Sequence, residues 1–75
     1  DIRVNSISPG YFATDLNREF LASEAGEAMR KRIAMRRFGD FPDLNGALLL
    51  LASDASRFMT GSDIIVDGGH LLYSL

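Results

Sequence analysis

The feature that most constrains this chain is a β-branched segment near its start that ends in a Pro-Gly break. The segment spans residues 2–7 and takes its β-branched content from Ile2, Val4 and Ile7. Because such residues favour strands, we expect a strand over 2–7. Pro9 has no N–H to donate to a sheet, and Gly10 can adopt the positive φ of a sharp turn. The strand is therefore expected to stop at Gly10.

The residues that follow this break are candidates for binding a ligand. In open α/β sheets, ligands bind at the carboxyl ends of the strands. We expect a sharp turn there to leave backbone N–H and C=O groups unpaired on Tyr11, Phe12 and Ala13, next to the Thr14 hydroxyl. A planar amide such as a nicotinamide carboxamide could pair with one N–H, one C=O and one hydroxyl. The same residues also fit an ordinary loop, so their spacing alone leaves both interpretations open.

Two helices are predicted next. Thr14-Asp15 can cap a first helix, in which apolar residues recur at helical spacing at Leu16, Phe20 and Leu21 while Asn17 faces solvent. Ser23 can cap a second helix that continues to Ile33, with its acids early and its bases late. That polarity matches the helix dipole and accounts for the basic residues without a nucleic-acid partner. Because aromatic interleaving is absent and the net charge is −2, we predict no nucleic-acid binding.

A third helix is predicted over residues 43–52, with Pro42 in its first turn. This segment is apolar almost all round and contains four consecutive leucines, Leu48 to Leu51. A helix that is apolar on every side must be covered on every side. One face is expected to pack on the sheet, and the other against either a second subunit or another part of its own domain.

The last predicted element is a strand over 62–66, closed by Asp67-Gly68-Gly69. Two strands joined through crossover helices are expected to pair in parallel as a right-handed unit. His70 is the only histidine of the chain, and no carboxylate or cysteine stands at ligand spacing from it. We therefore expect a tail residue at His70, with no catalytic or metal-binding role.

Several motifs together resemble the short-chain dehydrogenase/reductase family. The first is Ile2-Arg3-Val4-Asn5-x-Ile7-x-Pro9-Gly10-x-x-x-Thr14, which is similar to that family's sixth strand and following loop. Met35-x-Arg37-x-Gly39, the run from Leu51 to Ser56, Thr60-Gly61 and Val66-Asp67-Gly68-Gly69 follow in the family's order and at its distances. The resemblance covers nearly the whole chain. It departs from the family at Phe41, where a proline is usual, so we expect the third helix to start one residue later than in the family.

The resemblance implies an α/β fold, namely the C-terminal part of a Rossmann-like doubly wound parallel sheet. Residues 1–14 would form a strand and cofactor loop, 15–37 a substrate lid, and 38–75 the final helix and strand. The implied cofactor-binding residues, for NAD or NADP, are Pro9, Gly10, Tyr11, Phe12 and Thr14. The implied lid residues that contact substrate are Leu16 and Phe20.

The implied activity is hydride transfer between a nicotinamide and a small carbonyl or alcohol substrate. No glycine-rich phosphate loop and no Tyr-x-x-x-Lys pair is present, since neither Tyr11 nor Tyr73 has a lysine four residues later. No catalytic residue is therefore predicted in this chain, which we expect to be the C-terminal segment of a larger enzyme. The alternative is a catalytically inactive relative that acts as an oligomerisation or interaction module.

Length and composition bear on the size of the core, on assembly and on location. At 75 residues with no cysteine, the chain has neither a disulfide nor a thiolate metal site to support a small core. A core of that size supplies roughly 3–5 kcal/mol, so we expect the chain to be part of a larger domain. The leucine-rich helix cannot leave one face in water at little cost, and the resemblance implies pairing across a subunit interface, so we expect a homodimer or homotetramer formed through helix 43–52 and strand 62–66. No metal site and no membrane partner is predicted, and the absence of an apolar span or signal favours a cytoplasmic location.

Overall fold

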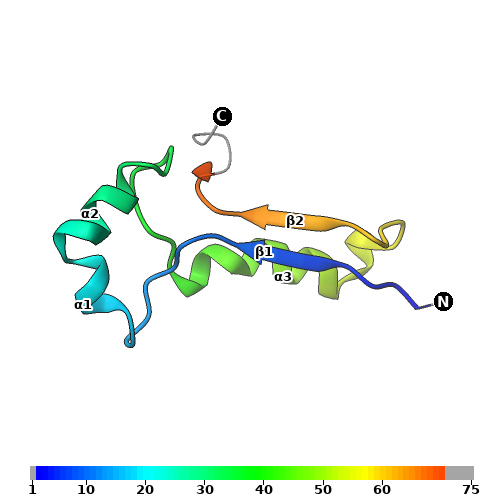
Figure 1. Ribbon diagram of the computed structural model, residues 1–75. Helices are drawn as coiled ribbons and strands as arrows, with labels where there is room; N and C mark the ends of the chain where they lie inside the picture. The colour runs from blue at the N-terminus through cyan, green and yellow to red at the C-terminus, as the bar shows by residue number, and fades with distance from the viewer. Residues whose placement is uncertain (1, 71–75) are drawn as a thin grey trace.

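The computed structural model of the protein describes residues 2–70, and Tyr73 lies outside that range. Two short strands run side by side, with helices between them in the sequence (Figure 1). The elements in chain order are β1 (Ser6–Pro9), α1 (Arg18–Leu21), α2 (Glu24–Arg30), the 3₁₀ helix η1 (Phe41–Leu44), α3 (Asn45–Ala52), the 3₁₀ helix η2 (Asp54–Ser56) and β2 (Asp63–Val66). The predicted α/β class is confirmed.

β1 and β2 form a parallel pair whose register runs from Ser6 opposite Asp63 to Pro9 opposite Val66. The predicted parallel pairing is confirmed, but the predicted strand over 2–7 begins too early. Residues 2–5 lie outside the strand because their polar groups bind the segment before β2. Asn5 illustrates this: its side-chain amide donates to the Met59 carbonyl at 3.0 Å and accepts from the Ser62 N–H at 2.9 Å.

Pro9 closes β1 without interrupting it. A proline at the last position of a strand costs no ladder bond, because the next donor, the Gly10 N–H, reaches the Val66 carbonyl at 3.0 Å. At the other end, the Asp63 carboxylate accepts from the hydroxyls of Ser8 at 2.7 Å and Ser6 at 2.8 Å. These bonds lower the pKa of Asp63 and join the two strands on one face.

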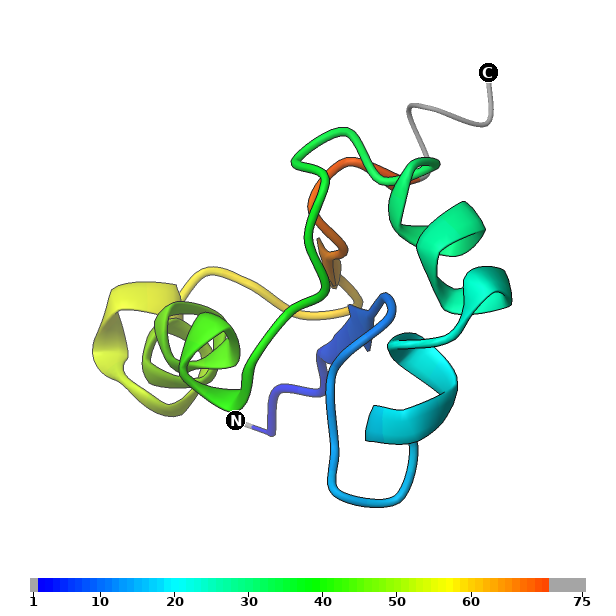
Figure 2. The same ribbon diagram turned by 90° about the vertical axis from the view of Figure 1, so that its left-hand side faces the viewer.

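α3 lies along the face of the strand pair opposite the one that carries the Asp63 hydrogen bonds (Figure 2). The half-buried strand residues alternate with exposed ones and are Ile7, Ile64 and Val66. The half-buried positions of α3 and the turn before it are Leu44, Ala47, Leu50 and Leu51, whereas Leu48 is 53% and Leu49 70% exposed. The helix therefore has an inner and an outer side, which its leucine run alone does not distinguish.

The crossover from β1 to β2 through α3 is left-handed, so the right-handed prediction is wrong. In Figure 1 both strands point the same way and α3 passes behind β1, while in Figure 2 α3 and the α1–α2 pair lie on opposite sides of the strands. The right-handed rule describes a helix that follows its strand directly and packs back on the sheet. Here α1 and α2 first take the chain to the other side, and residues 31–40 then lead it across the carboxyl end of the strands.

The helix ends differ from the predictions in ways that side-chain hydrogen bonds explain. α1 begins at Arg18, because residues 14–17 form a turn of their own before it. α2 is capped by Ser23 as predicted, with the Gly26 N–H donating to its hydroxyl at 3.3 Å, but ends at Arg30. The predicted helix over 43–52 starts as η1, since the Asp43 carboxylate accepts from the Asp40 N–H at 2.8 Å and tightens the first turn.

Few large apolar side chains are buried within the described part of the chain. Ile33 is 1% exposed and packs against Gly68, where an added Cβ would lie 2.9 Å from Ile33 Cγ2. Many others remain exposed, among them Ile2, Leu16 and Phe58. Exposed apolar surface of this extent is typical of regions that other protein covers. Within residues 2–70, no helix has the length and apolar character that a membrane crossing requires.

Candidate functional site

The candidate cofactor loop, residues 9–14, leaves β1 where β2 also ends. Its entry is fixed by a close approach between Gly10 and Asp67. A Cβ built on Gly10 would lie 2.6 Å from the Asp67 Cβ and 2.9 Å from its Cα, distances that leave no room for a side chain. The expected positive φ at Gly10 is wrong: the glycines with positive φ are Gly61, Gly68 and Gly69. Glycine is needed at position 10 for space, and not for its backbone angle.

The loop is paired with a segment that the sequence did not reveal as its partner. The Gly39 N–H donates to the Tyr11 carbonyl at 3.0 Å, and the Ala13 N–H donates to the Gly39 carbonyl at 2.9 Å. Phe12 and Gly39 thereby form a parallel bridge. The Phe12 ring covers Gly39 so closely that a Cβ added to Gly39 would lie 2.6 Å from the ring. The expectation that the groups of all three loop residues are unpaired is therefore wrong for the Tyr11 carbonyl and the Ala13 N–H, and also for the Phe12 carbonyl, which the Asn17 side chain binds.

Extended backbone points successive groups to opposite sides, so Phe12 turns its own N–H and C=O away from Gly39. On that side, the Phe12 carbonyl accepts from the Asn17 side-chain amide at 3.0 Å. Within residues 2–70, the Phe12 N–H has no hydrogen-bond partner. The Thr14 hydroxyl accepts from the Asn17 N–H at 3.3 Å, and its own proton remains available to donate.

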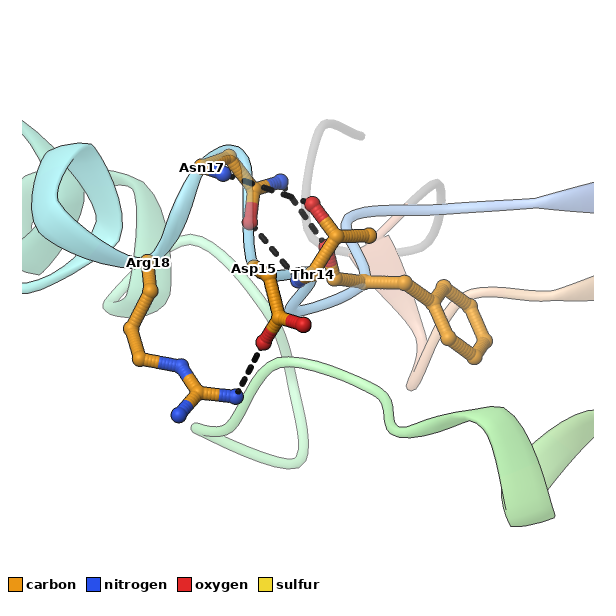
Figure 3. Close-up of polar contacts among 5 residues, drawn as sticks. Thr14, Asp15, Asn17 and Arg18 are labelled. Atoms are coloured by element: carbon orange, nitrogen blue, oxygen red, sulfur yellow. Dashed lines mark hydrogen bonds and ion pairs between the residues drawn. The ribbon is translucent and has the colours of Figure 1, made fainter.

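Asn17 is the residue of this site that the sequence analysis missed. Figure 3 shows its side chain turned back toward Thr14, whose N–H donates to Asn17 Oδ1 at 2.7 Å. The prediction of a solvent-facing Asn17 on a helix is therefore wrong. The spacing Thr14-x-x-Asn17 is that of a capping box, in which residues three apart exchange backbone and side-chain bonds. That spacing is the signal that could have identified it.

The predicted lid divides into an exposed part and an anchored part. Leu16 is 99% and Phe20 52% exposed, and both lie in the part that contains α1. The anchored part contains Ile33, the most buried apolar residue of the described chain, and Met35, whose N–H donates to the Gly68 carbonyl at 2.9 Å. A lid built on this arrangement would move at residues 15–30 about a fixed end at 33–35.

A cavity of about 190 Å³ lies beside the loop, between it and the end of β2. Its wall includes apolar side chains and one ion pair, in which Arg37 Nη1 lies 2.9 Å from Asp43 Oδ2. The Arg37 guanidinium lowers the pKa of the Asp43 carboxyl, which therefore stays ionised and paired. Asp43 is thus unsuited to act as a general acid at neutral pH.

His70 does not extend freely from the end of β2, as a tail residue would. It is half-buried, and its ring meets the Tyr11 ring edge-on with centroids 5.2 Å apart. This contact holds the Tyr11 side chain toward the end of β2. Tyr11 therefore contributes to the shape of the loop through its ring as well as its backbone.

Comparison with known proteins gives a family for this arrangement. The family model described as enoyl-(acyl carrier protein) reductase matches residues 1–70. An NADP-dependent mannitol dehydrogenase of Hypocrea jecorina is 50% identical over 68 residues, which are 91% of this chain and 25% of that protein. An L-xylulose reductase of the same species is 47% identical over 70 residues, 93% of this chain and 24% of that protein. The chain thus spans about a quarter of the length of the curated relatives it matches.

Solved structures of similar proteins contain the same arrangement of elements. A gluconate 5-dehydrogenase from Burkholderia cenocepacia, in complex with NADP and tartrate, aligns with a TM-score of 0.84 and 38% identity over 93% of this chain and 28% of that one. A 4-hydroxyisoleucine dehydrogenase mutant, complexed with NADH and succinate, aligns with a TM-score of 0.83 and 39% identity, over 95% of this chain and 30% of that one. The chain shares the Rossmann-type fold of these enzymes and belongs to the short-chain dehydrogenase/reductase family.

Proposed function

We propose that this chain is the cofactor-loop and lid segment of an NAD(P)-dependent oxidoreductase. The complete enzyme would transfer a hydride between the nicotinamide and a carbonyl or alcohol carbon of a small substrate. The observation that carries this proposal is the Phe12 N–H, which has no partner among the described residues and lies two residues before Thr14, whose hydroxyl proton finds no acceptor among them either. The relatives named for mannitol and L-xylulose favour a polyol or ketose as the substrate class.

The loop would contribute to the reaction by positioning the nicotinamide ring. The nicotinamide, when bound, supplies or accepts the hydride. The Phe12 N–H is suited to donate to the carboxamide oxygen, and the Thr14 hydroxyl to donate to a carboxamide or nearby phosphate oxygen. A ring fixed through its amide presents one face to the substrate, and such orientation lowers the entropic part of the barrier. Both NAD and NADP fit this role, because the carboxamide is common to them.

Thr14→Val tests this proposal in the complete enzyme. Valine keeps the shape of threonine but can neither donate to the cofactor nor accept from the Asn17 N–H, a long bond of 3.3 Å, and one lost bond is worth about 0.5–1.5 kcal/mol. We expect the cofactor KM to rise about two- to tenfold. The melting temperature should change little, and the substrate KM at saturating cofactor should be retained. A cofactor KM equal to that of the wild type would remove Thr14 from the site and refute the proposal.

We further propose that residues 15–30 close over the substrate, with Leu16 and Phe20 providing apolar contacts. Their exposure supports this role, because a lid needs apolar groups that are free to meet a ligand. Amide exchange in the unliganded enzyme should be faster in residues 15–30 than at Ile33 and in β2, since a lid opens for exchange of ligands. Exchange as slow in α1 as in β2 would contradict a mobile lid.

A homodimer or homotetramer formed through α3 and β2 remains part of the proposal. Its support is the outer side of α3, where Leu48 and Leu49 are exposed. A cytoplasmic location also stays a prediction, favoured by the absence of cysteine from the sequence. We also propose that this chain is the C-terminal segment of a larger domain, because its motifs resemble the sixth strand, final helix and last strand of the family.

A further inference from the structure

We infer that Asn17 is a positioning residue that holds the cofactor loop in its binding conformation before the cofactor arrives. This inference rests on the proposed function of residues 9–14. Asn17 itself does not contact the cofactor. It acts through Phe12 and Thr14, the residues that would contact the cofactor.

Asn17 connects three points of the loop at once. Its Nδ2 donates to the Phe12 carbonyl at 3.0 Å, and its Oδ1 accepts from the Thr14 N–H at 2.7 Å. Its backbone N–H donates to the Thr14 hydroxyl at 3.3 Å (Figure 3). Both ends of one planar amide are therefore used on two backbone groups that are two residues apart. Rotation of Phe12 or Thr14 out of this arrangement would break at least one of these bonds.

The side chain of Asn17 is committed to the loop and not to the helix that follows. Asn17 is the residue before α1, a position where asparagine usually accepts from the N–H groups of the first turn. No such bond is made here, although the Asn17 carbonyl accepts from the Leu21 N–H at 2.9 Å. A cap on the first turn of α1 therefore does not account for the orientation of the side chain, which completes the capping box with Thr14 and binds Phe12. Asn17 joins the start of the lid to the cofactor loop.

These bonds also determine which groups the loop presents. Since the Phe12 carbonyl and the Thr14 N–H are already occupied by Asn17, the Phe12 N–H and the hydroxyl proton of Thr14 remain for a ligand. Both are donors, and they suit an acceptor such as a carboxamide or phosphate oxygen. A loop ordered in advance avoids the entropic cost of ordering upon binding, and this saving should appear as cofactor affinity.

The test uses the complete enzyme with variants at this position. Asn17→Ala removes both side-chain bonds and should raise the Kd for the cofactor about five- to twentyfold. The kcat at saturating cofactor should fall less than twofold, because the occupied loop is ordered by the ligand. Asn17→Gln carries the same amide on a longer side chain and should recover most of the affinity. Asn45→Ala, at an exposed asparagine with no side-chain hydrogen bond within residues 2–70, is the matched control and should bind like the wild type.

A merely structural role predicts a different pattern, in which the melting temperature falls and cofactor affinity at low temperature is unchanged. That result would overturn the inference. If Asn17→Ala does not fold, Asn17→Asp replaces it, since aspartate keeps the shape and the acceptor but cannot donate to the Phe12 carbonyl. Wild-type affinity in Asn17→Asp would likewise overturn the inference.

A double-mutant cycle with Thr14→Val separates this inference from the proposed function. If Asn17 acts through Thr14, the loss in the double variant should be smaller than the product of the two single losses. Independent, multiplicative losses would overturn the inference. A loss in Thr14→Val with wild-type affinity in Asn17→Ala would overturn the role of Asn17 and leave the cofactor site in place.

Discussion

Gly10→Ala is expected to lower kcat/KM for the cofactor between about tenfold and 100-fold in the complete enzyme. The added methyl group would lie 2.6 Å from the Asp67 Cβ and 2.9 Å from the Asp67 Cα. Because Asp67 directly follows β2, neither atom can give way without shifting the strand, and overpacking of this kind costs about 1–3 kcal/mol. The shift would move Tyr11 and Phe12, and a displacement of about 1 Å at a positioning loop can cost 100-fold in rate.

Gly46→Ala is the matched control for this change. Among residues 2–70, an added Cβ at Gly46 meets nothing within 4 Å. Since alanine favours a helix over glycine by about 1 kcal/mol, this variant should be as stable as the wild type or slightly more stable. Steady-state kinetics and thermal unfolding of both variants provide the measurement. Wild-type cofactor kinetics in Gly10→Ala would show that the loop is not held by its contact with β2.

Leu49→Asp is expected to give a folded subunit that no longer assembles, whereas Leu51→Asp is expected to unfold it. Leu49 is 70% exposed on the outer side of α3, while Leu51 is half-buried on the side toward the strands. A buried leucine is worth roughly 1.5–3 kcal/mol, and an unpaired carboxylate in its place adds a desolvation cost. In a two-fold interface a charge at position 49 enters twice, so the assembly should lose more stability than the subunit.

Light scattering and circular dichroism of the complete protein distinguish these outcomes. The wild type should be a dimer or tetramer at micromolar concentration, and Leu49→Asp should be smaller with the wild-type helix content. A monomeric wild type would contradict the assembly, and would indicate that the outer side of α3 is covered by other parts of its own domain. An assembled enzyme without cofactor affinity would instead support the interaction-module alternative.

The parts of this fold that sequence could predict are those with strong local signals. The Pro-Gly break ended β1 correctly, because the restriction at Pro9 acts within one or two residues. The Ser23 cap was also correct, since a cap and its target lie three residues apart. The parallel pairing of β1 and β2 followed from the order of elements alone.

Two of the errors concern interactions between distant segments, and a third is local. The partner of the loop at Gly39 carries no mark in the sequence near Phe12, so the paired groups of Tyr11 and Ala13 could not be foreseen. The left-handed crossover depends on where α1 and α2 pass the sheet, which no local pattern records. Helical periodicity predicts a solvent-facing Asn17 only if the helix includes the turn at 14–17, whereas the capping-box spacing indicates a contact with Thr14.

The most direct test of the cofactor loop is a crystal structure of the complete enzyme with NAD or NADP bound. We expect the carboxamide oxygen to accept from the Phe12 N–H at about 2.7–3.2 Å, with the Thr14 hydroxyl donating to a cofactor oxygen. Asn17 should keep its bonds to Phe12 and Thr14 in the complex. A bound nicotinamide whose carboxamide contacts neither Phe12 nor Thr14 would contradict the proposed role of the loop.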